Sequence, residues 1–231
     1  DYKTSKMLNN KIKKIDVITF TNVFAHIENF KELIKSLKNL ITKETLIVIE
    51  NHYLGSVIEK KQFDTFYHEH PRTYSLTSFL KISKLLEMNL IKYKLPKRYG
   101  GNIRVFYSRK EYGALKKFKL VKKEKVFFKK FDNLNKSIHI WKNNKKSEII
   151  KLNKKYGPLP AKAFPGRAAI LLKILNLKKK NIDCIFEQSN SIKIGFNAPR
   201  TNIPIESDKY LKKMLHNRPI INLAWHIKKE I

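Results

Sequence analysis

The stretch Thr45-Leu46-Ile47-Val48-Ile49-Glu50, written TLIVIE, decides the fold of this chain. It is β-branched and almost uniformly apolar, which is typical of a strand buried on both faces of a parallel sheet. A second strand-like run, DVITF at 16–20, precedes it, and NFKELIKSLKNLI at 29–41 repeats apolar residues at helical spacing between the two. Strand, helix and strand in this order predict a right-handed βαβ unit, and therefore an α/β fold with parallel strands.

Further elements follow along the chain. LTSFLKISKLLEMN (76–89) indicates a helix, and the runs at 90–95 and 102–108 indicate two strands on either side of a Gly100-Gly101 turn. Positions 114–155 alternate lysines with apolar residues and contain no proline, which predicts one or two long helices with a solvated basic face.

The sequence pattern changes at Gly157. From there on, strand-like and helix-like segments alternate again, which predicts a smaller α/β domain. The segments in order are a turn-rich GPLPAKAFPGR, a helix AAILLKIL (168–175), a strand IDCIFE (182–187), a loop FNAPRTNIPI ending in a strand, a helical DKYLKKMLHN and a last strand in PIINLAW. We therefore expect three parts, with boundaries 1–112, 113–155 and 156–231.

The composition limits the function classes. The formal net charge of +31 would ordinarily indicate a nucleic-acid partner. Only seven of the 50 basic residues are arginine, however, whereas base and phosphate recognition favours the arginine fork, so we expect no nucleic acid. One cysteine, Cys184, excludes a disulfide framework or a cysteine-rich zinc module within these residues. No apolar run is long enough to span a bilayer and no signal-peptide core is present, which predicts a cytoplasmic protein without a membrane partner.

The strip FYHEHPRTYS at 66–75 contains two histidines, a glutamate and two tyrosines, all of which can donate or accept protons. His68 and His70 at i, i+2 can face the same side as metal ligands, but zinc needs three or four ligands and the sequence names no others, so we expect no metal. A solvated polar loop is a second interpretation. The third is acid–base chemistry, because a histidine near neutral pKa can remove a proton beside a carbonyl while a tyrosine donates to the resulting oxyanion.

The strip extends to QFDTFYHEHPRTYSLTSF (62–79), which resembles the signature of sugar C-methyltransferases. Six further blocks agree with that family in order and spacing, over nearly the whole chain from about residue 15. They are TNVFAHIENF (21–30), TLIVIENHYL (45–54), YGGNIRVF (99–106), AKAFPGRAAILL (161–172), APRTNIPI (198–205) and INLAWHIKKEI (221–231). Many members differ from this chain at Pro71-Arg72-Thr73.

The resemblance implies an activity. Family enzymes use S-adenosylmethionine to methylate a carbon next to the keto group of a nucleotide-linked deoxysugar. Carried over by residue, His70 is the general base, Tyr67 and Glu69 position the sugar and tune that histidine, and His26 stabilises the enolate. The same comparison assigns Asn22 to the cofactor. It places the block around Gly100, Gly101 and Arg104 near the substrate, with a plain hairpin turn as the alternative for the two glycines. Arg167, at a helix start, is a candidate for binding the substrate diphosphate, and Arg200 and Thr201 are further substrate candidates. A purely structural role stays open for these three residues.

The resemblance also implies that the chain is the C-terminal portion of such an enzyme. Residues 1–112 would be the second half of a Rossmann-like methyltransferase domain, 113–155 a helical connector and 156–231 a C-terminal Rossmann-like domain. No GxG cofactor loop occurs in the sequence, and DVITF corresponds to the family's fourth strand, so we expect an unpaired apolar edge and weak S-adenosylmethionine binding by the isolated chain. An N-terminal half on a separate chain is a possible partner. A non-catalytic remnant with a sugar-nucleotide pocket and a basic nucleic-acid-binding module stay open as alternatives.

Overall fold

The computed structural model describes residues 1–12, 14–110, 118–211 and 217–225, which form two compact units. The N-terminal unit comprises residues 1–62 and 68–132, and the C-terminal unit comprises 63–67 and 133–231. Both units are mixed α/β structures, so the predicted fold class is confirmed at that level. The boundaries at residues 112 and 155 stay a prediction, as does the Rossmann-like character.

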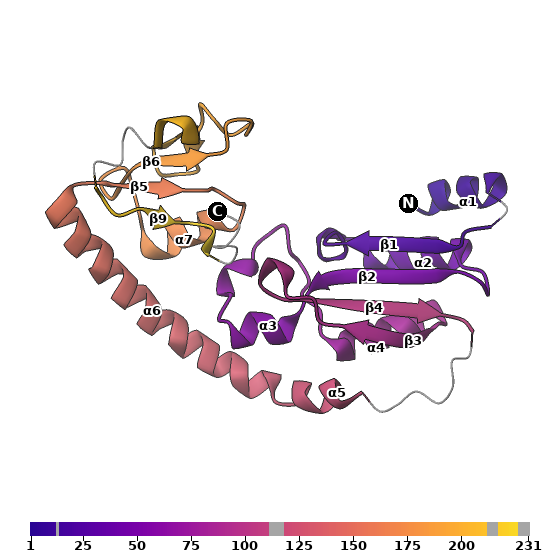
Figure 1. Cartoon of the computed structure of the whole chain (residues 1–231). Coiled ribbons are helices and arrows are strands. Elements are labelled where there is room, and N and C mark those ends of the chain that lie inside the picture. The colour runs from indigo at the N-terminus through magenta and orange to yellow at the C-terminus, as the bar shows by residue number, and fades with distance from the viewer. Residues whose placement is uncertain (13, 111–117, 212–216, 226–231) are drawn as a thin grey trace. The chain divides into compact units, whose positions relative to one another are not determined.

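The N-terminal unit is built on a four-stranded sheet with the order β1-β2-β4-β3 (Figure 1). The predicted βαβ unit is confirmed, because β1 (Val17–Thr21) and β2 (Leu46–His52) pair in parallel and α2 (Phe30–Leu40) connects them. The two strands predicted around the glycine turn are β3 (Asn89–Lys94) and β4 (Asn102–Ser108), and β4 pairs antiparallel with both β2 and β3.

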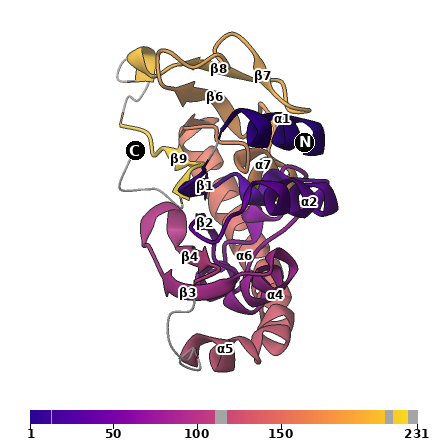
Figure 2. The ribbon, with the colours of Figure 1, turned by 90° about the vertical axis from the view of Figure 1, so that its right-hand side faces the viewer.

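Helices α2 and α4 (Leu76–Leu86) cover one face of this sheet, as Figures 1 and 2 show. The covered face is apolar because every second residue of the strands points toward the helices; Ile47, Ile49 and Val105 are completely buried. The N-terminus of α4 is held by a capping box between Ser75 and Ser78. Helix α1 (Tyr2–Lys11) packs against α2.

β1 is an edge strand of the sheet. Among the residues that the structure describes, no strand pairs with its outer side, and Val17 is 53% exposed. The apolar edge predicted from the sequence is therefore present. Such an edge offers a row of unpaired backbone groups to another strand.

The C-terminal unit contains a five-stranded sheet with the order β7-β8-β6-β5-β9. Its four parallel strands are β5 (Leu159–Lys162), β6 (Ile182–Glu187), β8 (Ile203–Ser207) and β9 (Ile221–Asn222), and the short β7 (Asn197–Ala198) is antiparallel. Helix α7 (Ala168–Leu175) packs on this sheet (Figure 1). The C-terminal part of α6 (Phe127–Tyr156) contributes Trp141 and Ile149 to the same core.

Most of the predictions for the second half are confirmed, but one strand was missed. The long helices at 114–155 are confirmed as α5 (Lys119–Glu124) and α6, with 111–117 outside the described residues. The stretch GPLPAKAFPGR contains the strand β5, which tolerates Pro160 because the register shifts at that point. The last strand is only two residues long, and most of the helix predicted at 208–217 lies outside the described residues, after η4 (Asp208–Tyr210).

The remaining elements are short: η1 (Phe24–His26), α3 (Leu54–Glu59), η2 (Phe63–Thr65) and η3 (Arg98–Gly100). Over the described ranges, no helix is long and apolar enough to cross a bilayer.

Candidate active site at the carboxyl ends of β1 and β2

The site lies where the parallel strands β1 and β2 end. Asn22 follows β1 directly, with a positive φ of 54°, and His26 lies in η1 just beyond it. Glu50 and His52 occupy the end of β2. Because α/β sheets bind their ligands at the carboxyl ends of the strands, this edge is the first place to look for chemistry.

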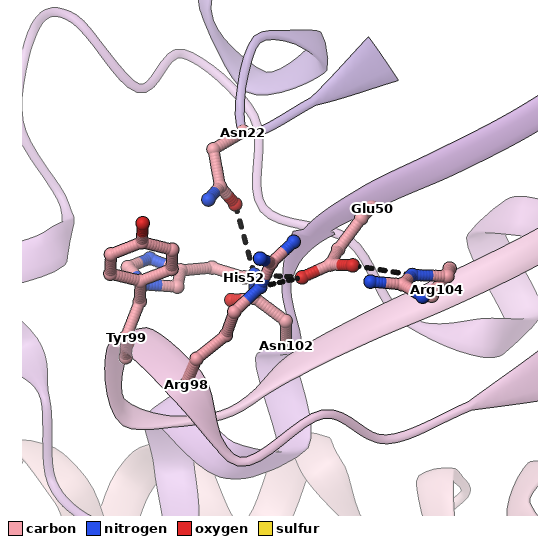
Figure 3. A network of polar contacts seen from close by, with 7 residues as sticks. All are labelled: Asn22, Glu50, His52, Arg98, Tyr99, Asn102 and Arg104. Carbon is pink, nitrogen blue, oxygen red and sulfur yellow. Dashed lines mark hydrogen bonds and ion pairs between the residues drawn. The ribbon is translucent and has the colours of Figure 1, made fainter. Parts of the chain in front are cut away.

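Glu50 is the hub of a polar network at this edge (Figure 3). Its side chain is only 2% exposed, and its Oε1 accepts hydrogen bonds from Arg98 Nε at 2.6 Å and Asn102 Nδ2 at 2.9 Å. Its Oε2 accepts from Arg104 Nε at 2.5 Å. Burial by itself raises the pKa of the Glu50 carboxyl, but these hydrogen bonds outweigh burial and hold that pKa below its ordinary value. Glu50 is therefore a fixed anion that aligns its neighbours.

The network extends from Glu50 to the end of β1. The Nδ2 group of Asn102 also donates to Asn22 Oδ1 at 3.0 Å, and the backbone N–H of Asn22 donates to the Glu50 carbonyl at 2.8 Å. Asn102 thus ties the turn after β1 to the buried carboxylate, which fixes the direction of the Asn22 amide.

The loop at 98–101 is held beside this network by hydrogen bonds to its backbone carbonyls. His52 Nε2 donates to the Tyr99 carbonyl at 2.8 Å, so the tautomer protonated at Nε2 is held there (Figure 3). The Gly100 carbonyl accepts from Lys60 Nζ at 2.7 Å and Gln62 Nε2 at 2.9 Å.

Both glycines of this loop are required by its geometry. They have φ values of 84° and 121°, and a Cβ on Gly101 would stand 2.5 Å from the Ser56 hydroxyl. The loop conformation therefore explains why both positions are glycine. The assignment of the two glycines to the substrate stays a prediction.

Three histidines gather beside the network. The rings of His26 and His70 lie with their centroids 4.6 Å apart at 67°, and the rings of His52 and His70 lie 6.1 Å apart. His70 is partly buried, whereas His26 is exposed to solvent. Imidazole side chains are the groups that most often transfer protons in catalysis.

The loop that carries His70 is attached to the rest of the unit by two side chains. The guanidinium of Arg72 donates from Nη1 to the Ile27 carbonyl and from Nη2 to the Glu28 carbonyl at 3.0 Å. The phenol of Tyr74 donates to the Phe24 carbonyl at 3.2 Å, and burial raises its pKa to about 12, so it stays a donor at neutral pH. Both contacts join the His70 loop to the η1 region, which explains why His70 and His26 meet.

The structure thus brings together some of the predicted residues. Asn22, His26, His70 and Arg104 lie at one edge of the N-terminal unit, with the Gly100-Gly101 loop beside them. Glu69 is half exposed, with a carboxylate oxygen 3.9 Å from His68 Nε2. Tyr67 belongs to the C-terminal unit, so its role toward the sugar stays a prediction.

Sequence reasoning missed the residues that organise this edge, namely Glu50, His52, Arg98 and Asn102. One signal was available for Glu50, because it is the only charged residue in the run TLIVIE, which is otherwise almost uniformly apolar, and a buried charge needs partners.

The predicted substrate residues of the C-terminal unit do not lie together. Arg167 follows the carboxyl end of β5 and is only 5% exposed, with its guanidinium on Asp64. Arg200 and Thr201 precede β8 and so lie at the amino end of the parallel strands. The Thr201 hydroxyl donates a hydrogen bond to the Ala198 carbonyl of the same turn at 2.8 Å.

A metal-binding arrangement is not found in the part of the chain that the structure describes. There, no three or more histidine, cysteine, aspartate or glutamate side chains form a group that could hold a metal ion.

Comparison with known proteins identifies the family. The model of the C-methyltransferase C-terminal domain matches residues 97–231, which is more than half of the chain. The chain belongs to this C-methyltransferase family. The matched range of this C-methyltransferase chain includes Arg98, Asn102 and Arg104, whereas the three histidines precede it.

A curated relative points the same way. The C-methyltransferase NovU of Streptomyces niveus is 30% identical over 83 residues, which make up 36% of this C-methyltransferase chain. The match covers 20% of that protein, so the chain spans only a part of its relative.

The described residues fit one side of a site for S-adenosylmethionine, the donor that the family implies. Asn22 ends β1 at the position where α/β sheets bind ligands, and its amide is held in place by Asn102. Beyond β1, none of the described strands continues the sheet, so these residues form a wall on one side only.

Proposed function

We propose that this chain supplies the sugar-activating side of a methyl transfer to a carbon next to the keto group of a nucleotide-linked sugar, with His70 as the general base. The observation that carries the proposal is the contact of the His70 ring with the rings of His26 and His52 at the carboxyl edge of β1 and β2. Family membership supports C-methylation as the reaction class.

The chemistry assigned to the residues is a proton abstraction. The C–H bond next to the keto group breaks, the proton goes to the His70 imidazole, and the electron pair moves to the keto oxygen as an enolate. His26 donates a hydrogen bond to that oxygen and stabilises the charge. S-adenosylmethionine supplies the methyl group for the carbon so activated.

Positive charge at this edge favours the anionic intermediate. Glu50 neutralises one of the two guanidinium groups that contact it, so the network with Arg98 and Arg104 keeps one net positive charge. Arg104 contacts Glu50 through Nε and its side chain is 34% exposed, which leaves part of the guanidinium accessible to a substrate. The nearby charge also attracts a nucleotide diphosphate.

A complete donor site requires further residues next to β1. The outer edge of β1, with which no described strand pairs, supports this. The proposal therefore includes an N-terminal half, on the same or a separate chain, that continues the sheet and completes the S-adenosylmethionine site.

The test uses the half-reaction that needs no methyl donor. The purified chain is incubated in D₂O with a nucleotide-linked 4-keto-6-deoxyhexose, and deuterium incorporation next to the keto group is followed by NMR. We expect exchange above the buffer rate, and loss of about 10²-fold or more in His70→Ala. The matched control is His68→Ala, which removes a largely exposed histidine two residues away and keeps the activity.

Exchange that is equal in wild type and His70→Ala contradicts the assignment. Saturable binding of the sugar nucleotide without exchange favours the alternative of a non-catalytic remnant that retains the pocket.

A further inference from the structure

Helix α5 brings a buried carboxylate to the start of helix α4, within the N-terminal unit (Figure 1). Glu124, the last residue of α5, is 8% exposed. Its Oε1 accepts hydrogen bonds from the Leu76 N–H at 2.8 Å and from the Tyr53 hydroxyl at 3.1 Å. Its Oε2 accepts from the N–H of Thr77 at 2.8 Å and from the hydroxyl of the same residue. Four donors thus converge on one buried carboxylate, and these contacts form the Glu124 link.

The Glu124 link joins two segments that carry histidines of the candidate site. Tyr53 directly follows His52 at the end of β2, and Leu76 directly follows the strip FYHEHPRTYS, which contains His70. The same oxygen atom of Glu124 accepts a hydrogen bond from both residues. The rings of His52 and His70 lie 6.1 Å apart, so a shift of one segment against the other changes the distance between those two rings.

Capping of α4 explains only a part of these contacts. The helix already has a capping box, in which the N–H of Ser78 donates to Ser75 Oγ at 3.1 Å and the N–H of Ser75 donates to Ser78 Oγ at 2.8 Å. Glu124 accepts from two further N–H groups of the first turn. The Tyr53 hydroxyl lies outside the helix, however, and no helix cap requires it. The link therefore does more than cap a helix, because it attaches a second segment to it.

The neighbouring sequence leaves room for the Tyr53 phenol. Gly55 occupies a helical position in α3, where glycine ordinarily costs stability relative to alanine. A Cβ on Gly55 would stand 2.3 Å from ring atom Cε1 of Tyr53 and 2.8 Å from its hydroxyl oxygen. Burial, together with the nearby Glu124 carboxylate, raises the pKa of the Tyr53 phenol far above its ordinary value, so the phenol remains a donor at neutral pH.

We propose that Glu124 is a positioning residue that fixes the segment carrying His52 against the segment carrying His70. It acts through Tyr53 and through the first turn of α4, and not on the substrate itself. A base that removes a C–H proton needs its position held closely, which a buried link of this kind provides. The proposal rests on the proposed function in one respect, namely that His70 is the base. In this role α5 belongs to the machinery of the site, although the sequence predicts only a connector there.

Three variants weaken the link in different ways. Tyr53→Phe removes the hydroxyl and leaves Glu124 in place on the helix. Glu124→Gln turns a carboxylate oxygen into an NH₂ group, which places a donor against donors. Gly55→Ala displaces the phenol without changing either partner. The matched control is Tyr107→Phe, which removes the hydroxyl of a completely buried tyrosine in the same unit; that hydroxyl donates to the Phe79 carbonyl of α4 at 3.0 Å.

Amide exchange of the full chain, followed by NMR, is the first readout. The backbone N–H of Leu54 donates to the Tyr74 carbonyl at 2.8 Å, across the same two segments, so its exchange rate reports whether they stay together. We expect this amide to exchange about tenfold faster in Tyr53→Phe than in Tyr107→Phe. Urea unfolding should show similar losses of stability for the two variants, since each removes one buried hydroxyl donor. Glu124→Gln and Gly55→Ala should accelerate the same amide.

The sugar isotope-exchange assay supplies a readout that a general loss of stability does not reproduce. In Tyr53→Phe we expect kcat to fall about tenfold with KM near the wild-type value, because the substrate still binds while the base is less well positioned. Tyr107→Phe should keep both constants. The double variant Tyr53→Phe/Glu124→Gln should be no slower than Glu124→Gln alone, because both changes break one link.

An acceleration of the Leu54 amide that is equal in Tyr53→Phe and Tyr107→Phe overturns the proposal, as does an unchanged rate in Tyr53→Phe. A kcat that falls equally in both variants overturns it as well. Amide exchange does not depend on turnover. A wild-type chain that fails to exchange the sugar proton therefore contradicts the proposed function, while the amide rates still decide whether Glu124 holds the two segments together.

Discussion

Replacing Glu50 with glutamine tests whether the buried carboxylate organises the edge of the sheet. The carboxylate is 2% exposed and each of its oxygens faces an arginine Nε. In Glu50→Gln one of these oxygens becomes an NH₂ group, which places a donor against a donor and removes the charge that compensates the guanidinium groups. We expect both arginine contacts to weaken.

The magnitude follows from the exposure of the partners. Removing one partner of a fully buried ion pair costs about 3–5 kcal/mol. Here Arg98 and Arg104 keep 44% and 34% of their side-chain surface in water, so hydration recovers part of that loss. We expect Glu50→Gln to lower the free energy of opening of β2 by about 2–3 kcal/mol.

The assay is amide exchange of the β2 peptide, residues 46–52, at increasing urea concentration. Glu87→Gln is the matched control, because Glu87 forms an exposed ion pair with Lys38 and its loss is expected to change little. A loss for Glu50→Gln that is no larger than that of the control would refute the reasoning.

The same prediction has a pH dependence. The folded state lowers the pKa of Glu50 below its unfolded value, so the carboxylate contributes its full stability above the unfolded pKa of about 4.3. That contribution is lost as the pH falls through the lower folded pKa. The difference between wild type and Glu50→Gln should therefore shrink on acidification below about pH 4.

Two further variants test the loops beside the histidines. Gly101→Ala combines a strained φ of 121° with a Cβ 2.5 Å from the Ser56 hydroxyl, so we expect a loss of about 2–3 kcal/mol in thermal or urea unfolding. Gly157→Ala, with a φ of 72° and open space around its Cβ, should lose clearly less, and equal losses would contradict the steric argument. Tyr74→Phe leaves the buried Phe24 carbonyl without its donor and should cost about 1–2 kcal/mol by urea unfolding. The folded pKa of Tyr74 is raised to about 12, so the phenol contributes its full stability below the unfolded pKa near 10 and loses it as the pH rises through 12. If wild type and Tyr74→Phe have the same free energy of unfolding at pH 8, the hydrogen bond does not stabilise the fold.

The periodic elements of the N-terminal unit could be predicted because one local pattern determines each of them. TLIVIE forms β2 since Ile47 and Ile49 fill the core under α2 and α4, and the spacing in 29–41 produces the buried face of α2. β5 escaped prediction because prolines mark it as a turn, and its strand character comes from pairing with β6 and β9. Pairing of that kind is a tertiary effect that local propensity does not contain.

The candidate site was predictable only in part, for the same physical reason. His70 and His26 were found from their motifs. The contact of Glu50 with Arg104 arises from the antiparallel register of β2 and β4, which places the two residues directly opposite each other. The bond between Asp64 and Arg167 joins positions 103 residues apart, and no spacing rule connects them.

The two networks of buried charge belong to different units of the chain. Glu50 is an anion that gathers side chains of its own unit around the end of β2, so its loss should disturb the edge where the substrate is expected. Asp64 is an anion that compensates Arg167 and accepts a hydrogen bond from Trp225 within the C-terminal unit. A base that removes a weakly acidic C–H proton must be held within a fraction of an ångström of its productive geometry. Within the N-terminal unit, Arg72 and Tyr74 attach the stretch after His70 to the η1 region at two points, which restricts this loop more than one attachment would. Together with the network around Glu50, these contacts limit the conformations open to the proposed base.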